Sequence, residues 1–276
     1  MFFNTSTSPI GLDISDLSLK LVQLDKRGNK IKIQAISKVN LPAGYLDNGE
    51  IKNKEGIIKA IKALIENPKF GKVSSDEVIA CLPETKTFVK LIEVEKTPDE
   101  LAERIEAEIE KYVPMPIEEI YYDWQVISDL PDKQLVLIGA APKNIVNQYT
   151  SLLSEAKLSL IALEIEPIAI ARGLLKEESY RFKEEKNNNY GIIDIGARRA
   201  SMSVYSKNTV LFSLSMPISG EKITEDIAGV LDIEIEPAEK AKIICGLDDN
   251  KAKGVIKKII SGMIAELIEK IKEAVE

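Results

Sequence analysis

Gly11-Leu12-Asp13-Ile14-Ser15-Asp16 and Gly191-Ile192-Ile193-Asp194-Ile195-Gly196 are the two stretches that decide the fold of this chain. Each is an apolar strand that ends in an aspartate at a tight turn, and a hairpin pattern follows each of them. Backbone N–H groups at such a turn suit phosphate oxygens, and the carboxylate suits Mg²⁺ or its waters. One such turn alone usually marks only a hairpin. Two of them, about 180 residues apart, are a much more specific sign of phosphate binding.

The composition limits the chemistry that the chain can perform. With 276 residues and 45% hydrophobic residues, it can bury the core of one large or two medium domains. It has no histidine, which excludes Ser-His-Asp triads and histidine-rich metal sites. The formal net charge of -7 argues against a nucleic-acid partner, because phosphate backbones need a basic face. Cys81 and Cys245 do not indicate a disulfide framework, and Cys81 is expected to be a buried structural thiol.

Neither a membrane span nor a signal peptide is predicted. No apolar run reaches the roughly 18 residues needed to cross a bilayer, and residues 1–9 lack both a basic region and an apolar core. We therefore expect a cytoplasmic protein that reaches a membrane only through a partner.

Hydrophobic periodicity predicts strands alternating with helices in both parts of the chain, which is the pattern of an α/β protein. In the first part, strands are expected at 11–24, 31–35, 78–82, 88–94, 122–127, 134–140 and 158–163, and helices at 57–65, 101–112 and 145–153. In the second part, strands are expected at 190–194, 201–205 and 209–214, and helices at 223–231, 237–244 and 255–271.

Local signals define some boundaries. Thr97-Pro98-Asp99-Glu100 has the pattern of a capping box, with Thr97 as the N-cap and Pro98 as the first helical residue. The polar stretch 176–189 predicts a surface connector between the two parts. The last helix carries a wide apolar stripe, which favours packing in a core; an exposed coiled-coil seam is the alternative.

The order of these segments resembles that of a known family. The two aspartate turns are similar to the phosphate loops of the actin and sugar-kinase superfamily, in which nucleotide lies between duplicated halves. From Gly11 onward, the chain resembles the PilM family of type IV pilus assembly proteins. The similar segments include Val78-Ile79-Ala80-Cys81-Leu82-Pro83, Glu164-Ile165-Glu166-Pro167-Ile168-Ala169-Ile170-Ala171-Arg172 and Ile218-Ser219-Gly220-Glu221-Lys222-Ile223-Thr224.

The resemblance implies an actin-like ATPase fold, made of duplicated ribonuclease H-like halves with an inserted 1C subdomain of the FtsA and PilM type. The first half (1A) would comprise residues 1–87 and 161–189, and the inserted subdomain residues 88–160. The second half (2A and 2B) would comprise residues 190–276. Because PilM proteins continue to a glycine-rich loop over the adenine, the resemblance also implies that this second half is shortened.

The resemblance also assigns roles to residues. Asp13 and Asp194 would face Mg²⁺ and the phosphates, and Glu166 would join Asp13 in catalysis by orienting the attacking water. The other expected nucleotide contacts are Ser15, Lys20, Gly196, Ala197, Gly220, Thr224, Glu239 and Lys242. The alternative for Glu239 and Lys242 is a solvated helix face that carries two charges.

Several positions depart from the family pattern. Ser15 stands where the first loop usually has glycine, and Asp16 follows it; a second acid near phosphates is repulsive without Mg²⁺. The second loop has Arg198 and Arg199 in place of small residues, and these arginines would either neutralise phosphate charge or fill the site. We therefore expect an ATP-binding protein whose ATPase activity is weak or absent.

The resemblance implies a cytoplasmic component of type IV pilus assembly that lies at the inner membrane through partners. It would bind the N-terminal cytoplasmic peptide of a PilN-like inner-membrane protein, in a groove between 1A and 1C. It would meet the pilus assembly ATPases only indirectly. ATP and Mg²⁺ are the expected cofactors, and a homo-oligomer is left open. The alternatives are an active ATPase or kinase of the actin superfamily and an FtsA-like filament-forming protein.

Overall fold

The computed structural model describes residues 8–28, 30–97, 100–175, 189–207, 209–216 and 218–275. Contacts divide the chain into two compact units. One comprises residues 1–189 and 205–212, and the other comprises residues 190–204 and 213–276. Each unit is described by itself.

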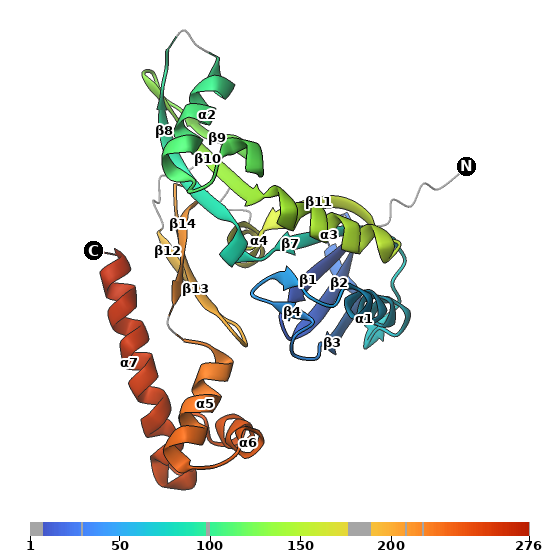
Figure 1. Cartoon of the computed structure of the whole chain (residues 1–276), viewed down its shortest axis with the longest axis vertical. Coiled ribbons are helices and arrows are strands. Elements are labelled where there is room, and N and C mark those ends of the chain that lie inside the picture. The colour runs from blue at the N-terminus through green and yellow to red at the C-terminus, as the bar shows by residue number, and fades with distance from the viewer. Residues whose placement is uncertain are drawn as a thin grey trace. The chain divides into compact units, whose positions relative to one another are not determined.

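The first unit is built on a mixed sheet of six strands in the order β11-β7-β1-β2-β3-β6 (Figure 1). These strands are β1 (Ile10–Ser15), β2 (Ser18–Arg27), β3 (Lys30–Asn40), β6 (Phe70–Gly71), β7 (Glu77–Leu82) and β11 (Ser159–Ile165). β1, β2 and β3 form an antiparallel meander, whereas β7 runs parallel to β1 and β11 runs parallel to β7. The parallel strands need crossover helices, which are the source of the helical layer.

One face of this sheet is covered by α1 (Lys54–Glu66) and α3 (Lys143–Glu155). Because side chains alternate along a strand, Ile10, Leu12 and Ile14 of β1 all point into that face. The two helices contribute to the same core the buried residues Ile57, Ile61, Leu64, Tyr149, Leu152 and Leu153. Each large aliphatic side chain buried in this way stabilises the fold by roughly 1.5–3 kcal/mol.

A second sheet in the same unit is antiparallel and has the order β8-β10-β9, with β8 (Phe88–Glu95), β9 (Ile120–Asp129) and β10 (Lys133–Pro142). Helix α2 (Leu101–Tyr112) covers one face of it (Figure 1). Ile105 and Ile109 of α2 pack with Val136 and Ile138 of β10 in a core of their own. This sheet therefore forms a compact subdomain inserted between β7 and β11.

The boundaries predicted for the inserted subdomain, residues 88 and 160, stay a prediction. The packing favours an earlier second boundary, because α3 belongs to the larger core. Tyr149 of α3 is fully buried there, and its hydroxyl donates a hydrogen bond to the carbonyl oxygen of Gly49 at 3.1 Å.

The second unit contains three helices and most of a three-stranded sheet in the order β12-β13-β14, of which residues 205–212 are counted with the first unit. These elements are β12 (Tyr190–Ile195), β13 (Ala200–Ser206), β14 (Thr209–Met216), α5 (Gly220–Leu231), α6 (Ile235–Cys245) and α7 (Val255–Val275). The stripe of α7 packs in the core as predicted: Leu267 joins Met202 and Met216 of the sheet, and Ile256 joins Ile227 and Ala238 of α5 and α6.

Short elements complete the structure. They are α4 (Glu166–Leu174), β4 (Leu46–Asp47), β5 (Glu50–Ile51) and the 3-10 turns Glu84–Lys86, Ile117–Glu119 and Ala252–Gly254. Within the described residues, no helix is both long enough and apolar enough to span a membrane.

Each strand and helix predicted from periodicity is present, but the predicted capping box is wrong. α2 begins at Leu101 with Glu100 as its N-cap, and Glu100 makes no side-chain capping bond. Thr97 therefore lies before the helix, while Pro98 and Asp99 lie outside the described residues. The predicted connector 176–189 also lies outside them, except for Asn189.

Candidate functional site

The first aspartate turn brings together three of the predicted phosphate-binding residues. Alternation along β1 buries its apolar residues and places Asp13 and Ser15 on the opposite face of the sheet. Lys20 pairs with Asp13 across the β1–β2 hairpin, and its Nζ lies 2.7 Å from Asp13 Oδ2. The Ser15 hydroxyl donates to both carboxylate oxygens of Asp13, at 2.9 and 3.0 Å. The turn therefore presents one carboxylate and one ammonium group side by side.

Asp16 does not join this group. It is buried, with 5% of its surface exposed, and its Oδ1 accepts a hydrogen bond from the backbone N–H of Gly49 at 3.2 Å. The second acid of the turn thus has a structural partner in Gly49.

Glu166 begins α4 and lies near the first turn. The evidence is the Cys81 thiol, whose pKa is raised from 9.0 to about 12 by burial and, after that, by the negative charges of Glu166, Glu164 and Asp13. These carboxylates therefore lie near enough to Cys81 for their charges to act on its thiol. Glu166 and Asp13 thus share the neighbourhood of Cys81, and their joint catalytic role stays a prediction.

The second aspartate turn is bonded to the start of α5. The carbonyl oxygen of Gly196 accepts from the N–H of Gly220 at 3.0 Å, and that of Ala197 accepts from the N–H of Glu221 at 2.7 Å. Gly196 is required here, because an added Cβ would lie 2.9 Å from the carbonyl oxygen of Arg199. These carbonyl groups take up N–H groups that a helix start would otherwise offer to an anion.

Arg198 and Asp194 of this turn differ in their surroundings. Arg198 Nε lies 3.0 Å from a carboxylate oxygen of Glu221, so this arginine is held at the start of α5. Asp194, at the end of β12, is exposed. The turn therefore offers a single aspartate, with an arginine nearby that is already engaged in an ion pair.

Thr224, Glu239 and Lys242 form one polar network between α5 and α6. Lys242 Nζ lies 2.6 Å from Glu239 Oε2 and donates to Thr224 Oγ1 and to the carbonyl oxygen of Gly220, both at 2.8 Å. The Thr224 hydroxyl donates to Glu239 as well. Four residues predicted as ribose, adenine and phosphate contacts are therefore neighbours, and their contact with nucleotide stays a prediction.

This network shifts the titration of Glu239. Burial acts to raise its pKa, but hydrogen bonds from Lys242 and Thr224 and the charge of Lys242 outweigh burial and lower it below 4.5. We expect Lys242→Met to raise the pKa of Glu239, because burial then acts with less opposition. Carboxyl-detected NMR titration would measure this, with Lys240→Met as the control, since Lys240 pairs with Glu236 instead.

The sign of the pH effect follows from the direction of that shift. A carboxyl whose pKa is lowered by folding adds stability above its unfolded pKa and loses that contribution as the pH falls through the folded value. Glu239 is half-exposed, so solvent screening keeps the effect small. An unchanged pKa in Lys242→Met would contradict the network.

The carboxylates of the described residues limit how Mg²⁺ could be held. No group of three or more histidine, cysteine, aspartate or glutamate side chains able to hold a metal ion occurs among the described residues. Mg²⁺ usually keeps several waters and takes one or two carboxylates together with substrate phosphates. Asp13, with its exposed carboxylate beside Lys20, fits that mode of binding but not a metal site formed by protein alone.

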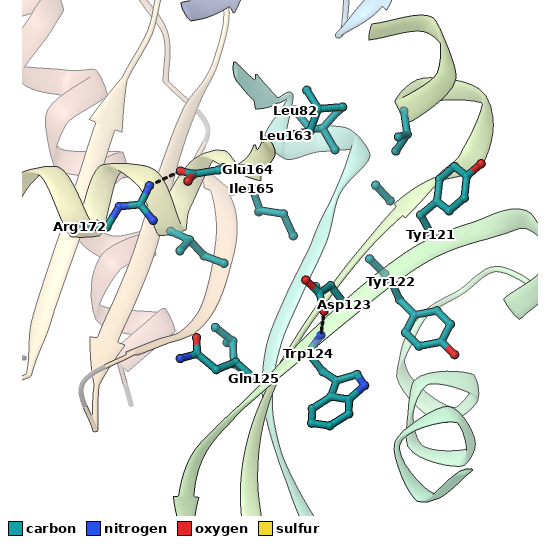
Figure 2. Close-up of a pocket in the computed structure, with 16 residues that line it drawn as sticks. Leu82, Tyr121, Tyr122, Asp123, Trp124, Gln125, Leu163, Glu164, Ile165 and Arg172 are labelled. Carbon is teal, nitrogen blue, oxygen red and sulfur yellow. Dashed lines mark hydrogen bonds and ion pairs between the residues drawn. The ribbon is translucent and has the colours of Figure 1, made fainter. Parts of the chain in front are cut away.

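A separate groove of about 340 Å³ lies in the first unit, between the inserted sheet and the β11–α4 segment (Figure 2). One wall comes from β9 and β10, where the pairs Asp123↔Gly139 and Gln125↔Leu137 place these residues on one face. Leu163 and Ile165 of β11 form the opposite wall. Most of the exposed lining is apolar.

Gly139 determines how close the two walls come. A Cβ added at Gly139 would lie 2.8 Å from the Cδ1 atom of Ile165, which is closer than real Cβ atoms approach. The missing side chain therefore leaves the room into which Ile165 projects. Glycine inside a strand often marks such a close approach.

Polar groups lie at defined points along the groove. Asp123 accepts a hydrogen bond from the N–H of Trp124 at 2.8 Å, and Glu164 pairs with Arg172, as Figure 2 shows. Tyr122 and Trp124 alternate to the other side of β9, where they pack against the core under α2. The groove thus combines aliphatic walls with two carboxylates.

Sequence reasoning missed Tyr121, Asp123 and Gln125, which line this groove. The signal was present, because period-two alternation from Tyr121 to Gln125 places these three residues on one side of the strand. Which side would face another element could not be read from the strand alone.

Comparison with known proteins decides the family. A family profile described as type IV pilus assembly protein PilM matches residues 11–276. The chain belongs to the PilM family. Among solved structures, a PilM-PilN type IV pilus biogenesis complex shares 26% identity with a TM-score of 0.77, covering 97% of this chain and 76% of that one.

More distant relatives agree with the actin-like fold of this PilM family member. MreB5 of Spiroplasma citri bound to AMPPNP has 13% identity, a TM-score of 0.52 and coverage of 97% of this chain and 78% of its own. FtsA of Buchnera aphidicola is 33% identical over 78 residues, and FtsA of Bacillus subtilis is 27% identical over 100 residues. These matches cover 28% and 36% of this chain but only 18% and 21% of the two FtsA proteins.

Proposed function

We propose that this PilM family member is a cytoplasmic component of type IV pilus assembly whose groove holds the N-terminal cytoplasmic peptide of a PilN-like inner-membrane protein. The groove between the inserted sheet and the β11–α4 segment is the observation that carries the proposal. The family match supports the pilus role, and the similarity to a solved PilM-PilN complex supports the partner. The protein would then reach the membrane, and the pilus assembly ATPases, only through such a partner.

The chemistry of the groove defines the peptide that it would accept. Its volume of about 340 Å³ lies at the lower end of the range for ligand pockets, so it would hold a few side chains of an extended segment. Leu163, Ile165 and Leu137 would pack against aliphatic peptide residues. Asp123 would attract a basic side chain or an N-terminal amine, whereas Glu164 is already paired with Arg172.

Peptide binding can be measured directly. A fluorescein-labelled N-terminal peptide of the PilN-like protein from the same organism should bind the full chain in the micromolar range, as measured by fluorescence anisotropy. A scrambled peptide of the same composition is the control. An unchanged anisotropy up to about 500 µM protein, which corresponds to an affinity of about 4.5 kcal/mol at best, would count against the proposal.

Nucleotide binding is the second part of the proposal. It is supported by the grouping of Asp13, Ser15 and Lys20, by the nearness of Glu166, and by the network around Lys242. Actin-like structures that resemble this fold were solved with AMPPNP or ADP bound. In the proposal, Lys20 stabilises phosphate charge, Asp13 takes part in holding hydrated Mg²⁺, and Glu166 orients water.

Calorimetry with Mg-ATP tests this part separately. Wild-type protein should bind Mg-ATP, and Asp13→Ala and Asp194→Ala should each weaken binding about tenfold or more, because a carboxylate that holds Mg²⁺ is lost. Asp129→Ala is a suitable control, since Asp129 pairs with Lys96 on the inserted sheet, far along the chain from either turn. Equal binding by all four proteins would show that the two turns do not form the nucleotide site.

A further inference from the structure

The groove of the first unit runs along the free edge of strand β9. Five consecutive residues of this strand, 121–125, line the groove (Figure 2). Successive side chains of a strand point to opposite faces of its sheet, so a groove over one face alone would meet only every second residue. Only a groove that also passes along the edge of the strand meets all five. β9 is the outer strand in the order β8-β10-β9, and no other strand of the described residues pairs with that edge.

The hydrogen bonds at the ends of the sheet show which way the backbone groups of β10 point. The N–H of Leu130 donates to the carbonyl oxygen of Lys133 at 2.9 Å, so Lys133 faces β9. The N–H of Lys96 donates to the carbonyl oxygen of Asp132 at 2.9 Å, so Asp132 faces β8. Backbone groups alternate in direction along a strand. The odd-numbered residues of β10 therefore face β9, and the even-numbered ones face β8.

This alternation places the backbone groups of Tyr122 and Trp124 on the free edge. They stand opposite Ala140 and Ile138, which are even-numbered residues of β10 and face β8. Residues directly opposite each other in an antiparallel pair exchange either both hydrogen bonds or neither. The N–H and C=O groups of Tyr122 and Trp124 therefore point away from β10. Their side chains pack against the core under α2, so the groove meets their backbone.

Asp123 protects one of these edge groups. The N–H of Trp124 donates to Asp123 Oδ1 at 2.8 Å, as the dashed line in Figure 2 shows. This bond satisfies a donor that has no partner in the sheet. Charged side chains commonly protect edge strands, because an open row of N–H and C=O groups pairs readily with another extended chain. Asp123 is exposed, so its carboxylate can turn away when another acceptor arrives.

We infer that the groove binds its peptide by strand addition, in which the peptide lies extended along β9 and its main chain pairs with Tyr122 and Trp124. The inference rests on the proposed function and states what the groove recognises: an extended main chain first, and side chains second. A peptide carbonyl oxygen would replace Asp123 as the acceptor of the Trp124 N–H group. The carboxylate of Asp123 would then be available to a cationic group of the peptide.

Strand addition also determines where the side chains of the peptide point. Every second side chain of an added strand points to the same face of the sheet as Asp123 and Gln125. Leu163 and Ile165 form the opposite wall of the groove on that side. The ligand is therefore an extended segment in which alternate residues are aliphatic and enter the groove, while the residues between them point to the other face of the sheet.

A scan of N-methylated peptides tests the inference. Each backbone N–H group of the PilN-like peptide is replaced in turn by N–CH3, which removes one donor and adds a methyl group that blocks pairing there. Only every second N–H group of an added strand faces its neighbour. Methylation should therefore weaken binding about tenfold or more at alternate residues, and less than about twofold at the residues between them. Fluorescence anisotropy on the full chain, with the label at the C-terminus of the peptide, measures each affinity.

Two variants of one residue test the same contact from the side of the protein. Tyr122→Pro removes an N–H group that faces the groove, and proline is tolerated on an edge strand where the N–H group points away from the neighbouring strand. Tyr122→Ala removes the same side chain but keeps the N–H group, so it is the matched control. Peptide affinity should be about tenfold lower in Tyr122→Pro than in Tyr122→Ala, with both variants folded by circular dichroism. The peptide scan uses wild-type protein and decides the question if Tyr122→Pro does not fold.

The outcomes separate this inference from the proposed function. If the unmodified peptide binds but methylation has the same effect at neighbouring residues, side chains hold the peptide, and strand addition is wrong while the proposed function stands. Equal affinities of folded Tyr122→Pro and Tyr122→Ala contradict strand addition in the same way. If the unmodified peptide does not bind, the proposed function fails and strand addition fails with it.

Discussion

Replacing Gly139 by leucine should weaken binding of the PilN-like peptide about a hundredfold, which is about 2.7 kcal/mol. Gly139 lies in the middle of β10, and even a Cβ at this position would lie 2.8 Å from Ile165 Cδ1. A leucine side chain must displace Ile165 and occupy the space between the two walls. The leucine would fill the groove volume that the peptide needs and remove the peptide's aliphatic contacts. Fluorescence anisotropy would measure the resulting loss of peptide affinity.

The control for this variant is Gly229→Leu, because nothing lies within 4 Å of a Cβ added at Gly229. It should bind peptide like the wild type. Thermal melts of both variants exclude unfolding as the cause. If Gly139→Leu is folded and binds the peptide as tightly as the wild type, the peptide binds elsewhere on the protein. The groove is then not the peptide site, although the PilN-like protein is still the partner.

The second large effect concerns the reactivity of Cys81. Its pKa of about 12, raised from 9.0 by burial and by three carboxylates, lowers the thiolate fraction at pH 8 about a thousandfold. Because the thiolate is the reactive form, Ellman's reagent should quickly modify only one thiol of the native protein, Cys245. It should modify Cys81 about a thousandfold more slowly in the native protein than in the denatured protein. Cys245→Ser then leaves Cys81 as the only thiol to follow.

The labelling rate of Cys81 also tests whether Asp13 and Glu166 lie near its thiol. In the Cys245→Ser background, Asp13→Asn and Glu166→Gln should each speed the labelling of Cys81, since each removes a negative charge that opposes its ionisation. Glu77→Gln, at the other end of β7, is the matched control and should leave the rate unchanged. Labelling of two thiols at the same rate in the native protein would contradict the raised pKa of Cys81.

The sequence predicted the elements of the fold because their signals are local. The β1–β2 hairpin follows from alternation around the first aspartate turn, and the stripe of α7 follows from helical spacing. The prediction of a capping box at Thr97 was wrong because four matching residue types do not ensure that a helix begins at those residues. The start of α2 at Leu101 is where Ile105 and Ile109 can reach the core of the inserted sheet.

The candidate sites depend on contacts between elements, and so only part of them could be foreseen. Glu239 and Lys242 are three residues apart on α6, which puts them on one helix face. That Thr224 of α5 completes their network depends on how two helices pack. The groove was harder still to predict, because the effect of Gly139 depends on the packing of β11, which places Ile165 opposite it. Side-chain periodicity describes one element, whereas a cavity needs two.

The start of α5 has a consequence for the speed of ligand entry. Its first N–H groups, on Gly220 and Glu221, are bonded to the carbonyl oxygens of Gly196 and Ala197. An anion that arrives there finds these two N–H groups already bonded. It can accept their hydrogen bonds only after the bonds to the two carbonyl oxygens break. This exchange slows capture, and an anion that forms fewer hydrogen bonds than it displaces gains little from binding there.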